Sequence, residues 1–277
     1  MTDSAAPASR RPPVPWRFFT LTFAISWGAW ACVAVAGGDI FHDLELGTVV
    51  LFGGFGPSIA GAVLIHRSAD PSAIPTFWRR VWDPRLVPPL WVLPIFALYP
   101  AVLTAASLLA GAPLDLGPAA ELMGTPARIP STLLFVLVFG PLAEELGWRG
   151  HALDRLKLRF GPLRASLVLG LAWGVWHLPL VFVEGAFMSG LGTDPVLLAG
   201  YIGTVVLYSI LFTWIHDHTS GSVLAAIGLH FSINATHRLV AIPALVHAAT
   251  AGVLFVVCAV VVGVWFRTGR SCQRPRI

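Results

Sequence analysis

The stretch AIPALVHAATAGVLFVVCAVVVGVWF (residues 241–266) decides the fold class, because it contains no Asp, Glu, Lys or Arg. A helix needs about 20 mainly apolar residues to cross about 30 Å of hydrocarbon, and this stretch is long enough. Because backbone groups in lipid must be hydrogen-bonded within their own segment, such a stretch is expected to be helical. The sequence predicts an all-α, polytopic membrane helical bundle with eight transmembrane helices. Seven more apolar blocks precede this one, at about 17–37, 47–66, 88–111, 130–147, 162–183, 195–215 and 221–236.

The composition of the whole chain agrees with a membrane protein. Of 277 residues, 56% are hydrophobic and 12% are charged, whereas soluble domains have about 45–50% apolar and about 25% charged residues. The chain contains no internal repeat and no linker that would separate a second domain. We therefore expect a single transmembrane domain at 17–266, between an N-terminal tail at 1–16 and a C-terminal tail at 267–277.

The distribution of basic residues predicts the orientation of the chain. There are 18 Lys and Arg residues and the formal net charge is +4. With the N-terminus in the cytosol, 16 of the 18 fall on the cytosolic side, and only Arg128 and Arg238 fall outside. Cytosolic loops of membrane proteins carry an excess of Lys and Arg. We therefore expect both termini to be cytosolic, and we attribute the positive charge to membrane topology and not to nucleic-acid binding.

The first polar cluster is EELGWR (residues 144–149), at the cytosolic end of the predicted helix 130–147. Ionisable groups inside a bilayer are costly and are candidates for function. Glu145 and Arg149 are four residues apart, so they lie on one face of a helix and can pair. The adjacent Glu144 points about 100° away, which leaves it as a candidate general base. The structural alternative is an ion pair at a helix end near the lipid headgroups.

The second cluster is WGVWHLPL (residues 173–180) in the predicted helix 162–183. Trp173 and His177 are four residues apart and share a helix face, so the indole can orient the imidazole. Pro179 is expected to distort the helix just beyond them. The alternative is that His177 is a packing residue.

The third cluster is HFSIN (residues 230–234) in the predicted helix 221–236. His230 and Asn234 lie four residues apart, so their side chains form a pair of hydrogen-bonding groups on one face. Such a pair can stabilise a developing oxyanion. The alternative is hydrogen bonding between neighbouring membrane helices, which uses the same residue types.

Two further motifs predict structure and not chemistry. The histidine-rich HDH (residues 216–218) falls between two predicted helices, where we expect a solvated turn and not a metal site. The glycines of GGFG (residues 53–56), together with Gly61, are typical of close helix packing. No lysine follows them, so they do not form a phosphate-binding loop.

The three clusters, in this order on successive membrane helices, resemble the CAAX prenyl protease and bacteriocin-processing (CPBP, or Abi) family. The strings EELGWRG, WGVWHLPL and GSVLAAIGLHFSIN are similar to those of its bacterial members, and the resemblance covers about 130–236. One position departs from the family pattern. The family usually has phenylalanine four residues before the histidine, whereas this chain has Trp173, a larger ring that would narrow the cavity.

The resemblance implies a membrane-embedded CAAX-type peptidase, a hydrolase. Glu144, helped by His177, would activate a water molecule. His230 and Asn234 would stabilise the tetrahedral oxyanion. The resemblance thus assigns catalytic roles to Glu144, His177, His230 and Asn234, and supporting roles to Glu145, Arg149 and Trp173.

A metal-dependent version of this mechanism is the alternative, because the family has also been described as metalloproteases. Glu144, His177 and His230 are residue types that can bind zinc with one position open. However, the chain has no His-Glu-x-x-His motif, and a glutamate-activated water needs no ion. We therefore favour the mechanism without a metal or other cofactor. Both versions need water, which predicts a hydrated cavity that opens toward the cytosol.

The expected partners are the lipid bilayer and a membrane-anchored peptide or protein substrate, either lipidated or bacteriocin-like. The Lys and Arg residues of the chain are all arginine except Lys157. This usage indicates a GC-rich bacterial genome, so we expect a multi-pass protein of a bacterial plasma membrane. The alternative function is a catalytically silent immunity or transporter-like protein that uses the same polar cavity for binding.

Overall fold

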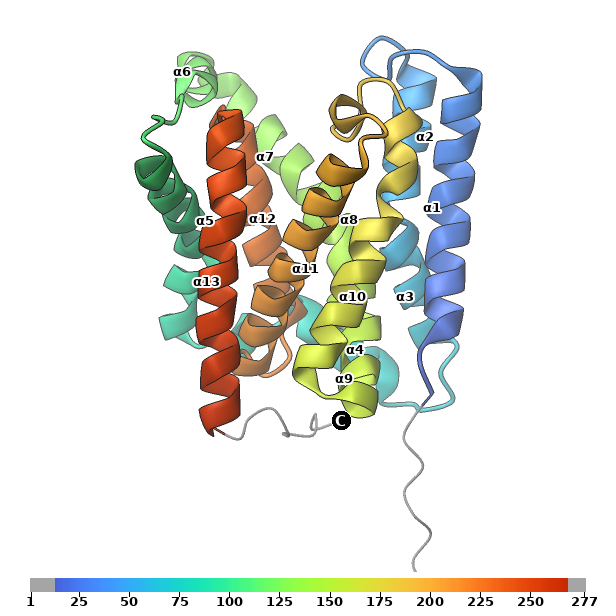
Figure 1. Cartoon of the computed structure of the whole chain (residues 1–277). Helices are drawn as coiled ribbons and strands as arrows, with labels where there is room; N and C mark the ends of the chain where they lie inside the picture. Colours follow the sequence, from blue (N-terminus) through green and yellow to red (C-terminus); the bar gives the residue numbers. More distant parts are fainter. Residues whose placement is uncertain (1–12, 269–277) are drawn as a thin grey trace, which may run out of the picture.

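The computed structural model describes residues 13–268 as a bundle of helices (Figure 1). Residues 1–12 and 269–277, most of the two predicted tails, lie outside this range. Within it there is no β-strand, and one isolated bridge joins Asp115 to Ala241. The long and short α-helices are α1 (Trp16–Ala36), α2 (Leu44–Gly54), α3 (Gly56–His66), α4 (Ala73–Trp82), α5 (Pro89–Ala110), α6 (Gly117–Gly124), α7 (Ile129–Leu137), α8 (Ala143–Gly147), α9 (Leu153–Phe160), α10 (Pro162–Trp176), α11 (Pro195–His218), α12 (Val223–Leu239) and α13 (Ala244–Thr268). Shorter helical turns are η1 (Pro84–Leu86), η2 (Pro126–Arg128), η3 (Val138–Leu142), η4 (Trp148–Ala152), η5 (Leu178–Phe182) and η6 (Ser189–Leu191).

The predicted multi-pass helical architecture is confirmed. In the described part of the chain, six helical segments are long and apolar enough to cross a membrane, and the bent pair α2 and α3 makes a seventh candidate. The remaining predicted span, 221–236, corresponds to α12, which has 17 residues and is shorter than these six. The count of eight spans and the cytosolic location of the termini stay predictions. The six segments are Trp16–Ala36, Pro89–Ala110, Pro126–Phe160, Pro162–Phe182, Pro195–His218 and Ala244–Arg267.

The helices form three neighbouring groups (Figure 1). Helix α13 packs against α5 on one side of the bundle, α10 packs against α11 in the middle, and α1 packs against α2 and α3 on the other side. The short helices α4 and α9 lie at one end, where α1 begins and α13 ends, and α6 lies at the opposite end. Helix α4 buries Phe77 and Val81 against the bundle.

The predicted helix 47–66 is broken in two. Helices α2 and α3 meet at an angle of 47° around Phe55. A break frees backbone carbonyls, which in lipid must find other partners. Helix α1 supplies them, because Ser26 Oγ donates a 2.7 Å hydrogen bond to the Gly53 carbonyl and Trp30 Nε1 donates a 3.0 Å bond to the Val50 carbonyl.

The predicted helix 130–147 continues as a helical segment to Phe160, with a kink at Phe139, so the EELGWR cluster does not lie at a helix end. Helix α8 carries the two glutamates and is flanked by the π-helical turns η3 and η4. The charged residues do not end the segment, because Glu145 and Arg149 pair with each other in its interior. Such π turns are wider than α-helix and occur frequently at functional sites.

Helix α3 crosses α8 at a very short distance, which confirms the packing role predicted for Gly61. A Cβ atom on Gly61 would lie 2.9 Å from the Gly147 Cα atom and 2.9 Å from the Leu146 carbonyl oxygen. A Cβ atom on Gly147 would in turn collide with the carbonyl of Pro57. The close approach of the two backbones fixes the position of α8.

The solvated turn predicted for residues 216–218 is wrong, because these residues form the last turn of α11. His216 is buried, and its Nε2 atom lies 2.8 Å from Nη2 of Arg80. Arg80 also forms an ion pair of 2.9 Å with Asp154. Ion pairing with residues of α4 and α9 therefore allows a polar segment to stay helical and buried.

Candidate active site

Glu145 and Arg149 form a fully buried ion pair in the centre of the bundle. Arg149 Nη1 donates to both carboxylate oxygens of Glu145 at 3.0 Å, as their four-residue spacing predicts. The guanidinium carbon lies 4.5 Å from the ring centroid of Trp173 and 3.9 Å from that of Phe212. Cation–π packing of this kind stabilises a desolvated guanidinium. The pair is therefore a rigid part of the core.

His230 is the third member of this polar group, a contact that the sequence did not predict. Its Nδ1 atom lies 2.7 Å from Oε1 of Glu145. A carboxylate paired with arginine can only accept, so Nδ1 carries a proton and donates it to this bond. The fixed Nδ1 proton leaves the opposite ring atom, Nε2, to face the site.

Glu144 has different surroundings from its neighbour. Its Oε2 atom accepts a 2.5 Å hydrogen bond from Nε1 of Trp173, and among the described residues its Oε1 atom has no hydrogen-bond partner. The side chain is 8% exposed, whereas Glu145 is completely buried. Phenylalanine, which the family pattern has at position 173, cannot make this bond. One oxygen of Glu144 is thus held in place and the other is left for water or substrate.

His177 caps the end of α10. Its Nδ1 atom donates a 2.9 Å hydrogen bond to the Trp173 carbonyl, so Nε2 keeps its lone pair and can accept a proton. The imidazole is enclosed by three aromatic rings, with centroid distances of 4.5 Å to Trp176, 5.6 Å to Phe187 and 5.7 Å to Tyr201. The distortion predicted at Pro179 is confirmed, because α10 ends at Trp176 and continues as the 3-10 turn η5.

Asn234 lies beside His230 against the backbone of Gly140. A Cβ atom on Gly140 would collide with Nδ2 of Asn234 and would lie 3.9 Å from Nε2 of His230. The absent side chain of Gly140, in the π turn η3, therefore makes room for the two groups that α12 presents. Gly140 was not predicted as a site residue, although a Gly-Pro pair shortly before two glutamates in an apolar segment was a signal that the helix is irregular there.

Of the seven residues that the sequence singled out, six are buried and Asn234 is half-buried, and Trp173 contacts four of the others. The indole ring is 5.5 Å from the His230 ring and 6.4 Å from the His177 ring, and its N–H group bonds Glu144. In the described part of the chain, no hydrogen bond links Glu144 directly to His177, His230 or Asn234. Both imidazole rings and the Glu144 carboxylate thus lie next to the indole of Trp173.

A zinc ion does not fit this arrangement well. In residues 13–268, no three His, Cys, Asp or Glu side chains converge in a way that suits a metal ion. Glu145 is engaged by Arg149 and His230, and one oxygen of Glu144 is engaged by Trp173. The alternative zinc ligands Glu144, His177 and His230 therefore receive no support from the geometry.

Comparison with known proteins gives two matches. Residues 126–236, which contain the whole cluster, match the model of the family described as Type II CAAX prenyl endopeptidase Rce1-like. A CAAX prenyl protease 2 of Methanococcus maripaludis is 28% identical to the chain over 253 residues, which cover 90% of this chain and 93% of the relative. The chain is thus similar to Rce1-like CAAX endopeptidases in its central segment and to a CAAX prenyl protease over most of its length. The two matches confirm the predicted resemblance to the CAAX protease family and the prediction of a protease.

Proposed function

We propose that this chain is an intramembrane endopeptidase in which Glu144 activates the attacking water. The observation that carries the proposal is the contrast between the two adjacent carboxylates. Glu145 is neutralised by Arg149 and hydrogen-bonded by His230, whereas Glu144 keeps one oxygen without a protein partner. A general base needs such a free lone pair within reach of the proton that it removes.

The other polar groups support the remaining parts of the reaction. The water oxygen attacks the peptide carbonyl carbon while a proton passes to Glu144, and Nε2 of His177 accepts a hydrogen bond that orients this water. The C–N bond then breaks, and the proton on Glu144 moves to the leaving nitrogen. The carbonyl oxygen becomes an oxyanion, which the Asn234 amide and an Nε2–H group of His230 stabilise by hydrogen bonds.

A lipidated, membrane-anchored peptide fits best as the substrate. The relative from Methanococcus maripaludis is a CAAX prenyl protease, and the matching family is described by the same activity. An apolar groove of about 440 Å³ lies between α5 and α12. Its lining includes Phe96, Gly228 and Phe231, and Phe231 directly follows His230 in the sequence. Its apolar lining suits the lipid chain of such a substrate, while α12 presents His230 and Asn234 to the peptide.

The test is cleavage of a quenched-fluorescent CAAX peptide, prenylated or unprenylated, by the purified protein in lipid nanodiscs. Glu144→Gln is expected to lower kcat/KM by about 10²–10⁴-fold without changing the unfolding temperature. Glu184→Gln, at an exposed glutamate outside the cluster, serves as the matched control and is expected to keep full activity. Cleavage by Glu144→Gln at the wild-type rate would exclude Glu144 as the base. Equal cleavage of both peptides would exclude the lipid as a recognition element.

A further inference from the structure

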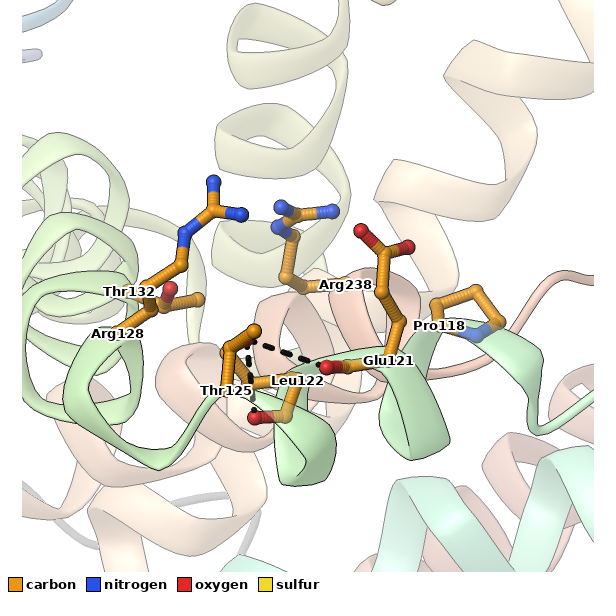
Figure 2. Close-up of a pocket in the computed structure, with 7 residues that line it drawn as sticks. All are labelled: Pro118, Glu121, Leu122, Thr125, Arg128, Thr132 and Arg238. Atoms are coloured by element: carbon orange, nitrogen blue, oxygen red, sulfur yellow. Dashed lines mark hydrogen bonds between the residues drawn. The ribbon is translucent and has the colours of Figure 1, made fainter.

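A small pocket at the α6 end of the bundle contains the two arginines that depart from the positive-inside distribution (Figure 2). Arg128 belongs to η2 and Arg238 to the last turn of α12, so residues 110 positions apart in the sequence line one site. Figure 2 shows both guanidinium groups extending to the same side as the carboxylate of Glu121. The pocket has a volume of about 50 Å³, and its lining residues are Pro118, Glu121, Leu122, Thr125, Arg128, Thr132 and Arg238.

The charges in this pocket are not balanced within the described residues. No carboxylate lies within ion-pair distance of Arg128 or Arg238 there. Glu121 is the one acidic residue in the lining, so the pocket carries two positive charges and one negative charge. Both arginines are exposed, so water screens their mutual repulsion, and a bound anion would lower it further.

The pocket lies at the ends of two helices. Arg128 directly precedes α7, and Arg238 is one residue before the end of α12. Because the ends of membrane helices lie near the lipid headgroups, we expect the pocket to lie at that depth. Beside the pocket, helix α6 and its flank expose large apolar side chains, with Leu116 60% and Met123 73% exposed. Exposed apolar residues next to a cationic pocket are typical of a surface that contacts lipid.

We propose that the Arg128–Arg238 pocket binds the phosphate group of an anionic phospholipid. A guanidinium group donates two parallel hydrogen bonds to phosphate, and two of them form a clamp. Thr132 adds a hydroxyl that has no hydrogen-bond partner among the described residues, whereas the Thr125 hydroxyl bonds the Glu121 carbonyl at 3.2 Å. The volume exceeds that needed for a single water, so a phosphate oxygen can enter. The excess positive charge selects a headgroup with net negative charge.

The competing explanation is that Glu121 is the partner of both arginines and that the pocket binds nothing. The two explanations predict opposite effects of Glu121→Gln. If Glu121 neutralises the arginines, its removal destabilises the protein and creates no tighter binding. If an anion binds, removal of a nearby negative charge strengthens the binding.

The experiment measures lipid binding by the full-length protein in detergent, using native mass spectrometry with phosphatidylglycerol or phosphatidylcholine. We expect saturable and preferential binding of phosphatidylglycerol. We expect the double variant Arg128→Gln/Arg238→Gln to bind it roughly 30-fold more weakly, at about 1 kcal/mol for each arginine. Arg267→Gln, at an exposed arginine at the far end of α13, is the matched control and should leave this binding unchanged.

Three outcomes would overturn the proposal. The first is equal phosphatidylglycerol binding by the double variant and the wild type. The second is displacement of the lipid by millimolar inorganic phosphate, which would assign the pocket to the free ion. The third is weaker binding in Glu121→Gln, which the clamp cannot explain. A folding defect in the double variant is detected separately by its peptidase activity, because the pocket shares no residue with the candidate active site.

Discussion

Trp173 is the residue on which the position of Glu144 depends. Its indole N–H donates a 2.5 Å hydrogen bond to one carboxylate oxygen, and its ring packs on the Arg149 guanidinium. The bond leaves the second oxygen of Glu144 without a hydrogen-bond partner among the described residues, so the indole orients the candidate base. A tryptophan at this position therefore adds a polar function to the aromatic one.

The variant Trp173→Phe removes this hydrogen bond and keeps an aromatic ring. Because a hydrogen bond to a charged group contributes about 1.5–3 kcal/mol, we expect kcat to fall by about 10- to 100-fold. Trp176→Phe is the matched control, since Nε1 of Trp176 is buried without a hydrogen-bond partner. Steady-state cleavage and thermal unfolding are measured for both variants. A larger loss of kcat in Trp176→Phe would show that ring volume matters and the hydrogen bond does not.

In the proposed mechanism, His230 donates a hydrogen bond from Nε2 to the oxyanion, while Nδ1 donates to Glu145. Glutamine carries an amide donor, so we expect His230→Gln to retain part of the activity. Alanine has no donor, so we expect His230→Ala to lower kcat further. The measurement is kcat for both variants. Equal kcat values in the two variants would contradict the donor role of this side chain.

The contacts between the side chains of the candidate site were only partly predictable from the sequence. The four-residue spacing of Glu145 and Arg149 predicted their ion pair, because both lie on one helix. The contact of His230 with Glu145 joins residues 85 positions apart, so no local pattern contains it. The bond from Trp173 to Glu144 spans 29 positions and depends on how two helices pack, although the unusual tryptophan marked the position.

The close packing of α3 against α8 at Gly61 and Gly147 holds α8 in place. Gly61→Ala puts a methyl group 2.9 Å from the backbone of α8, which has no side chain that can move away. We expect a loss of about 1–3 kcal/mol in unfolding free energy and a fall in activity, because α8 carries Glu144. Gly252→Ala in α13 has open space around it and should be neutral or stabilising. Equal unfolding curves for the two variants would contradict the tight crossing.

The bends and π turns within the helices were harder to predict from the sequence than the helices themselves. Apolar length predicted most helix positions within a few residues, since the hydrocarbon thickness sets that length. The bend at Phe55 and the π turns around α8 depend on partners from other helices, as with Ser26 and the Gly53 carbonyl. The HDH segment was assigned to a turn because its buried partner, Arg80, lies 136 positions away from His216.

For the whole molecule, the orientation in the membrane is the main prediction that awaits a test. Ala69, in the loop between α3 and α4, and Ala120, in α6, lie at opposite ends of the bundle and are both exposed. In a cysteine-free background, we expect Ala120→Cys to react with a membrane-impermeant maleimide in intact cells. Ala69→Cys should react only after permeabilisation, because arginine-rich loops stay in the cytosol. The reverse pattern would place both termini outside.

The bend between α2 and α3 also has a consequence for biosynthesis. Its freed carbonyls are bonded by Ser26 and Trp30, which belong to the preceding helix and leave the ribosome earlier. Helix α1 must therefore be in the membrane before α2 and α3 enter the lipid. A variant that lacks α1 would insert α2 and α3 with unsatisfied carbonyls. We expect such a variant to be degraded in the cell before its remaining helices assemble.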